Sequence, residues 1–250
     1  MPSRDFILNQ IFVGYPWKRI RRFFEKKIRY LHIHYPLHFK PVGREYDQSA
    51  SDLFDEIKQE IRKSSAAIFD ATGGNPNVAL EFGYAEALAL DIVLTVNQRK
   101  APKRKRRIER DSPTPIISDL RGKRVNEYKS QKTLDNILVR YVKKHSYTQR
   151  FQEMSRANLG RAGKKICLYI IRLFDDREVM RREEVIQRVL SEFPTAKQKA
   201  KVSKRKGYRW VDWFLDLLRR YQLISISQGR YAEVSITSYL NDGKGSNRHI

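Results

Sequence analysis

The stretch 66–88 constrains the fold of this chain more than any other, because it combines a strand, a turn and a helix start. An apolar run ends on Asp70, as a buried strand would. A glycine-rich turn over residues 72–74 follows. Asn75 and Pro76 then predict a helix start, since Asn is a preferred N-cap and proline suits the first helical position. The stretch therefore predicts a strand–turn–helix unit in which the strand end and the helix start lie together.

Strands and helices alternate along the rest of the first part of the chain. Apolar runs predict strands over 7–14, around His38, over 66–70 and 92–96, and at 115–117 with 124–125. Helical spacing of apolar residues predicts helices over 16–29, 53–61 and 134–141. This alternation predicts an α/β domain with an open, mostly parallel, flavodoxin-like sheet and helices on both faces.

Residues 165–240 have a different character. They contain three amphipathic helical runs and then two short alternating strands around a Gln-Gly turn. Three helices followed by a hairpin is the order of a winged helix, and the closing segment LLRRYQLISISQGRYAEVSIT resembles the last helix and wing of such domains. We therefore expect an α/β domain over 1–146, a linker over 147–164, a small α+β winged-helix domain over 165–240 and a tail over 241–250.

Glu81 is the candidate catalytic residue. It lies four residues after Asn77 and three before Tyr84, which places the three on one side of the predicted helix. Its carboxylate would sit above the carboxyl end of a strand, where open α/β sheets bind ligands. The nearby helix N-terminus is expected to keep Glu81 ionised. The alternative is that Glu81 is an exposed helix residue without a chemical role.

A family resemblance gives this arrangement a chemistry. The segment DATGGNPNVALEFGYAEAL, residues 70–88, resembles the strand–loop–helix of nucleoside 2-deoxyribosyltransferase-like and TIR-like proteins. Residues 119–125 with Tyr128 resemble the Asp-Leu-Arg-Gly-x-Arg-Val strand of such domains, and residues 11–15 resemble their first strand. The resemblance covers about residues 8–145.

The resemblance implies chemistry at an N-glycosidic bond. In the family, the glutamate that matches Glu81 attacks C1′ of a nucleoside or stabilises the positive charge that develops there. A carboxylate suits this task because the reaction passes through an oxocarbenium-like state. The resemblance and the predicted strand ends together give a set of substrate-binding candidates, which are Asp70, Thr72, Asn77, Tyr84 and Tyr15.

The charge of the chain points to a polyanionic partner. The formal net charge is +23, with 51 Lys and Arg against 28 Asp and Glu, and nucleic acid is the commonest partner of such a chain. One candidate contact is a predicted loop with Lys103, Arg104, Lys105, Arg106 and Arg107. The other begins the third helix of the winged-helix region, with Lys204, Arg205, Lys206 and Arg209. The alternatives are a solvated basic surface and a winged helix that binds protein.

The sequence implies no cofactor apart from a nucleotide as substrate. His32, His34 and His38 have no cysteine or acidic cluster beside them, so we predict no metal site. The single cysteine, Cys167, fits a reducing compartment. No apolar stretch reaches the roughly 20 residues that a membrane span needs. We therefore expect a cytoplasmic protein without membrane contact, and oligomerisation is left open.

Together these features predict an N-glycosidase that hydrolyses NAD or a related nucleotide at the ribosyl C1′, joined to a nucleic-acid-binding module. The pairing of domains resembles the N-glycosidase effectors of bacterial antiphage systems, in particular retron effectors, in which the winged helix docks on a reverse transcriptase–DNA complex. That resemblance implies a toxic defence role. The alternative is a non-catalytic, nucleotide-sensing, DNA-binding transcriptional regulator.

Overall fold

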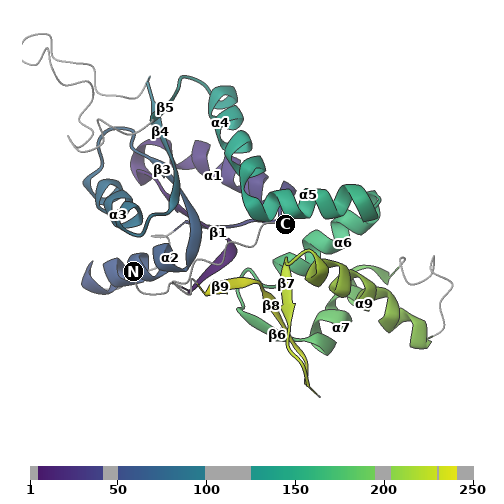
Figure 1. The fold of residues 1–250 in the computed structure, drawn as a ribbon. Coiled ribbons are helices and arrows are strands. Elements are labelled where there is room, and N and C mark those ends of the chain that lie inside the picture. The colour runs from purple at the N-terminus through teal and green to yellow at the C-terminus, as the bar shows by residue number, and fades with distance from the viewer. Residues whose placement is uncertain (1–4, 42–49, 99–124, 195–203, 230, 241–250) are drawn as a thin grey trace, which may run out of the picture. The chain divides into compact units, whose positions relative to one another are not determined.

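A computed structural model describes residues 5–41, 50–98, 125–194, 204–229 and 231–240 (Figure 1). By its internal contacts the chain divides into two compact units. The first comprises residues 1–143 and 239–250, and the second comprises residues 144–238. Within the described ranges, none of the helices has the length and apolar character to cross a membrane.

The first unit is built on a parallel sheet in the order β2-β1-β3-β4-β5, and β9 pairs with β1. Its strands are β1 (Asp5–Gly14), β2 (His38–Pro41), β3 (Ser64–Asp70), β4 (Asp91–Asn97), β5 (Val125–Tyr128) and β9 (Ser238–Leu240). The order 2-1-3-4-5 is that of flavodoxin-like sheets. The predicted α/β fold is therefore confirmed, although the segment at 115–117 lies outside the described residues.

Helices cover both faces of this sheet (Figure 1). They are α1 (Trp17–His34), α2 (Ala50–Lys63), α3 (Pro76–Ala87) and α4 (Gln131–Lys144). Helices α2 and α3 bury one face, where Phe69 meets Phe82 with ring centroids 5.7 Å apart. Helices α1 and α4 cover the other face and are linked by an ion pair of 3.0 Å between Lys27 and Asp135. Asn75 caps α3 as predicted, since its side chain accepts hydrogen bonds from two backbone N–H groups.

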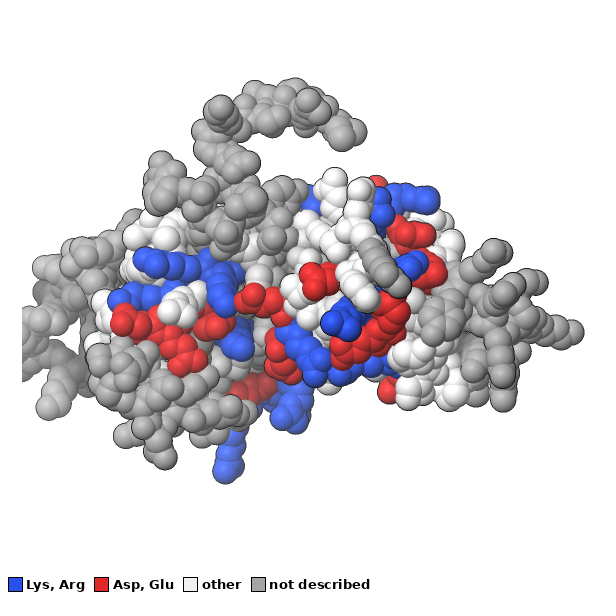
Figure 2. Space-filling view, turned by 90° about the horizontal axis from the view of Figure 1, so that it is seen from below, with Lys and Arg blue, Asp and Glu red and all other residues white. Residues whose placement is uncertain are grey.

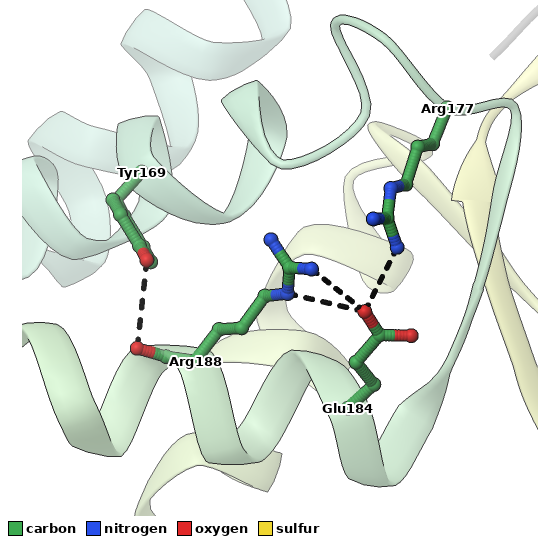
Figure 3. A network of polar contacts seen from close by, with 4 residues as sticks. All are labelled: Tyr169, Arg177, Glu184 and Arg188. Carbon is green, nitrogen blue, oxygen red and sulfur yellow. Dashed lines mark hydrogen bonds and ion pairs between the residues drawn. The ribbon is translucent and has the colours of Figure 1, made fainter.

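The second unit packs helices beside a three-stranded antiparallel sheet in the order β6-β8-β7. Its elements are α5 (Ser146–Asn158), α6 (Arg161–Arg172), β6 (Val179–Arg181), α7 (Arg182–Glu192), α9 (Lys204–Arg220), β7 (Ile224–Ile226) and β8 (Glu233–Ile236). On α7, Glu184 accepts hydrogen bonds from Arg177 and Arg188, and the carbonyl of Arg188 faces the Tyr169 hydroxyl (Figure 3). The three helices and the hairpin expected from the sequence are present, together with α5 and β6, and the assignment to the winged-helix class stays a prediction.

Two local details differ from the sequence prediction. The segment predicted as a linker begins with a packed helix, α5, which buries Tyr147, Phe151 and Met154, and the Tyr147 hydroxyl donates to the carbonyl of Leu223. The helix predicted over 16–29 runs on to His34, because its buried apolar positions continue through Leu31.

One buried carboxylate ties together the carboxyl ends of β3, β4 and β5. Asp70 is fully buried, and its Oδ2 accepts hydrogen bonds from the hydroxyls of Thr95 (2.9 Å) and Tyr128 (2.8 Å). Its Oδ1 accepts from the backbone N–H of Thr72 (2.9 Å), whose own hydroxyl accepts from the backbone N–H of Asn97 (2.8 Å). These contacts fix the strand ends and the start of the loop that leads into α3.

We predict that Tyr128→Phe destabilises the protein by about 1–3 kcal/mol, because it removes a buried hydrogen bond to a carboxyl group. Urea unfolding measured by circular dichroism gives the value. Tyr30→Phe is the matched control, since Tyr30 is 45% exposed, and it should change stability by less than about 0.5 kcal/mol. Equal stability of the two variants would contradict a structural role for the Asp70 contacts.

Candidate active site

Glu81 lies on α3 at the carboxyl end of β1. Its Oε2 is 2.6 Å from the position that a Cβ on Gly14 would take, and the Phe69 ring is 2.7 Å from the same position. Any side chain at Gly14 would therefore collide with both groups. The glycine that ends β1 allows the carboxylate to lie directly against the backbone of the strand.

The Glu81 carboxylate is partly buried and has no hydrogen-bond or ion-pair partner among the residues whose positions are described. Burial raises the pKa of Glu81 to about 7. The expectation that the helix N-terminus keeps Glu81 ionised is therefore wrong. Pro76 is the first residue of α3, so Glu81 lies in the second turn, whereas the helix dipole acts mainly within the first.

Asn77 and Tyr84 share the side of α3 that carries Glu81, as the spacing predicted. Asn77 is exposed. The Tyr84 ring is partly buried, and the Arg62 guanidinium lies 5.7 Å from its centroid. The Tyr84 hydroxyl is buried and has no hydrogen-bond partner in the described part of the chain. Of the two side chains, that of Asn77 is accessible to solvent, whereas the Tyr84 hydroxyl is enclosed by protein, and the role of both in binding stays a prediction.

The other three substrate-binding candidates are buried and engaged with protein groups. Both oxygens of Asp70 accept hydrogen bonds, and Thr72 is fully buried beside it. Tyr15 stacks on Phe24 with ring centroids 5.2 Å apart, and its hydroxyl lies 3.2 Å from Glu25 on α1. Since α1 and α3 cover opposite faces of the sheet, the Tyr15 side chain points away from Glu81. The structure does not bring these three into contact with Glu81, and their role in binding stays a prediction.

The proposed nucleic-acid contacts are described in part. Lys103, Arg104, Lys105, Arg106 and Arg107 lie outside the described residues, and the side chains of residues 204–209 do as well. The backbone of α9 begins at Lys204, so the basic run from Lys204 to Arg209 forms the first turns of this helix. On the face of the molecule seen in Figure 2, Lys and Arg are interspersed with Asp and Glu. The basic charge is therefore not concentrated on that face.

An apolar pocket with a volume of about 680 Å³ lies between α2 and α3 and reaches Leu94 of β4. Phe54 and Lys58 of α2 line it together with Leu80, Gly83 and Tyr84 of α3. Glu81 is not among the lining residues, although Tyr84, three residues further along α3, is one of them. We assign no substrate to the pocket, because none of its lining residues is a carboxylate.

Sequence reasoning missed the close approach of Gly14 to Glu81 and the partners Thr95 and Tyr128 of Asp70. A glycine at the end of an apolar strand was a usable sign of the first, since glycine there often marks a close backbone approach. Nothing in the sequence pairs Asp70 with residues on two other strands. That pairing depends on the order and register of the sheet.

Comparison with known proteins found similarity at the level of solved structures. No protein-family model matches the chain, and no curated protein matches it. A 2-deoxyribosyltransferase from Leishmania mexicana is similar with 16% identity and a TM-score of 0.44, over 55% of this chain and 99% of that one. A CMP N-glycosidase from Clostridium botulinum is similar with 14% identity and a TM-score of 0.33, over 53% of this chain and 98% of that one.

We predict that Gly14→Ala destabilises the protein by about 1–3 kcal/mol, because the new methyl group overlaps Phe69 and Glu81. Gly83→Ala is the matched control. No atom lies within 4 Å of a Cβ built there, and the position is an exposed helical one. The control should stabilise the protein by about 0.5–1 kcal/mol through helix propensity. Thermal unfolding of both variants tests the pair, and a neutral Gly14→Ala would contradict the close approach.

We predict that Glu81→Gln stabilises the protein more at pH 8 than at pH 4. The gain in the free energy of unfolding, variant minus wild type, should be larger at pH 8 by up to ~3 kcal/mol. The pKa of the folded state, about 7, lies above the ordinary value of 4.5. Ionising Glu81 therefore costs folding free energy, and wild-type stability falls as the pH rises between these two values. Urea unfolding across this range measures the difference. Glu86→Gln removes the same charge from the same helix, and a similar pH dependence in that control would refute the assignment to Glu81.

Proposed function

We propose that the first unit is an enzyme that cleaves or transfers the N-glycosidic bond of a nucleoside or nucleotide, with Glu81 as the catalytic carboxylate. The observation that carries the proposal is the setting of Glu81. Its carboxyl group lies against Gly14 at the carboxyl end of β1, has no polar partner in the described part of the chain, and has a pKa of about 7. Perturbed carboxyl groups of this kind cluster at functional sites.

The chemistry follows from the charge that builds up on the sugar. As the C1′–N bond breaks, its electron pair leaves with the base, and positive charge develops at C1′ and the ring oxygen. The base of CMP or of a nucleoside takes up a proton as it leaves, whereas the cationic nicotinamide of NAD leaves as a neutral molecule and the proton lost by water goes to solvent. Ionised Glu81 donates an electron pair to C1′ or stabilises that charge. Water then attacks C1′, loses a proton, and releases the sugar with Glu81 restored. The partly buried position strengthens this electrostatic interaction.

The finer assignment rests on the sequence resemblance. We propose a nucleotide as substrate, with NAD as the first to be tested, and Asn77 and Tyr84 as groups that contact its sugar or base. The two named similar proteins, a deoxyribosyltransferase and a CMP N-glycosidase, suggest nucleosides and CMP as the next substrates to test. A defence role with docking on nucleic acid or a nucleoprotein complex is proposed from the pairing with the second unit and from the basic start of α9.

We predict that Glu81→Gln lowers the rate of base release by about 10²-fold or more, because the variant keeps the shape and removes the charge. Purified wild type and variant are incubated with NAD, CMP and nucleosides, and free base is quantified by chromatography. Glu86→Gln, which changes a carboxylate five residues further along α3, should keep the wild-type rate. Equal rates in wild type and Glu81→Gln would eliminate Glu81 as the catalytic group.

The same assay distinguishes the alternative function. A nucleotide that binds with measurable affinity, while wild type releases no base from any of the substrates, would support a nucleotide-sensing regulator. For the enzyme, kcat/KM should rise with pH and level off above about pH 7, because Glu81 acts in its ionised form and its pKa lies there. A fall in kcat/KM above that pH would instead assign Glu81 the role of a general acid.

A further inference from the structure

Helices α1 and α4 present two exposed basic stripes on the first unit. Three exposed cations of α1 recur at helical spacing, and three of α4 do the same. The stripes consist of Arg22, Lys26 and Arg29 on α1, and of Lys132, Arg140 and Lys143 on α4. At 1.5 Å of rise per residue, the first stripe extends over about 10 Å and the second over about 16 Å.

The two stripes point in the same direction. On α1 the buried side is formed by Phe24, Ile28 and Leu31, which lie opposite the exposed cations on the helix. On α4 the buried side is formed by Leu134 and Leu138, again opposite the cations. Both helices pack on the same face of the sheet, so their outer sides both face away from it. Helices in contact lie about 8–10 Å apart, so the stripes form one broad surface.

The basic residues of these helices outnumber the acidic ones. Helix α1 contains seven Lys and Arg residues against one acidic residue, Glu25, which accepts a hydrogen bond from the Tyr15 hydroxyl. Helix α4 contains one, Asp135, which is paired with the buried Lys27. No ion pair within the described ranges involves any of the six cations. The surface therefore carries an excess of positive charge.

We infer that the α1/α4 surface, defined by these six cations, is a docking site for the phosphate backbone of double-stranded nucleic acid. A duplex carries one negative charge per about 1.7 Å of its axis, so stripes of about 10 and 16 Å each extend along several phosphates. Contacts of this kind position a protein on the duplex and carry no sequence information. An anionic membrane is the less suitable partner, because most apolar residues of both helices are buried in the core, and Tyr30 and Ile33 of α1 are the large apolar side chains that the described parts of these helices expose.

This surface is separate from the proposed catalytic site, because α1 and α4 lie on the face of the sheet opposite α3. It also differs from the basic segments 103–107 and 204–209. The inference therefore does not rest on the proposed enzymatic activity. Neutralising the surface should weaken attachment to nucleic acid and leave base release by Glu81 unchanged.

The test measures binding of the full chain to a labelled duplex of about 20 base pairs by fluorescence anisotropy, between 50 and 200 mM salt. Two triple variants are compared with wild type. The α1 variant replaces Arg22, Lys26 and Arg29 by Ala, and the α4 variant replaces Lys132, Arg140 and Lys143 by Ala. Each should weaken binding of unrelated sequences alike and make the slope of log affinity against log salt less steep by up to about three. The matched control removes the exposed cations Arg156, Lys164 and Lys165 of the second unit, with the same loss of charge.

The outcomes separate local contact from overall charge. A larger loss in both α1 and α4 variants than in the control supports the surface. Equal losses of affinity in the α1, α4 and control variants would overturn the inference and attribute binding to net charge. Unchanged affinity in the α1 and α4 variants would overturn it and attribute binding to other basic segments. Tighter binding to vesicles with anionic lipid than to duplex, with the same dependence on the six cations, would overturn it in favour of a membrane partner. Circular dichroism confirms that each variant is folded.

Discussion

The buried hydrogen bonds of Asp70 are the interaction on which the first unit depends. One carboxyl group accepts from the loop N–H of Thr72 and from hydroxyls on β4 and β5, so a single side chain determines how three strands end. Burial raises the pKa of Asp70, and these hydrogen bonds act against that shift. Removing any donor leaves the buried carboxyl group with fewer hydrogen bonds to offset its desolvation, which lowers the free energy of unfolding in a low-dielectric interior. The position of α3, and with it the position of Glu81, follows from this arrangement.

Two carboxyl groups on one strand–loop–helix unit therefore have different tasks. Asp70 is fully buried and satisfied by protein donors, and it stabilises the fold. Glu81 is partly buried, lacks such donors in the described residues, and has a pKa near neutrality. A carboxyl group with a perturbed pKa is a candidate for a functional role, which is the basis of the role we propose for Glu81. Ionising Glu81 without hydrogen-bond donors lowers the free energy of unfolding, and such a loss of stability is common at functional sites.

The positive charge of the chain is organised by the fold as well as by composition. Residues of α1 and α4 bury their apolar sides against the sheet, which leaves their basic sides facing solvent together. The few carboxylates on these helices are directed to Tyr15 and to Lys27. Like charges held side by side repel one another, and a polyanionic partner relieves that repulsion. The same principle applies to the basic run that begins α9, although its side chains lie outside the described residues.

The sequence by itself determined the α/β class, the strand–turn–helix unit at 66–88 and the position of Glu81 on a helix face. These features depend on local signals, which are the spacing of apolar residues, the glycine-rich turn and the helix start at Asn75 and Pro76. It also located most of the helices of the second unit from their apolar spacing. It did not determine that residues 147–158 form a packed helix, since polar neighbours concealed the pattern. The tertiary structure alone decided that Asp70 has protein hydrogen-bond donors while Glu81 has none in the described residues, and which helices bring their basic sides together. Those properties arise from strand order, register and packing between residues that are far apart in the sequence.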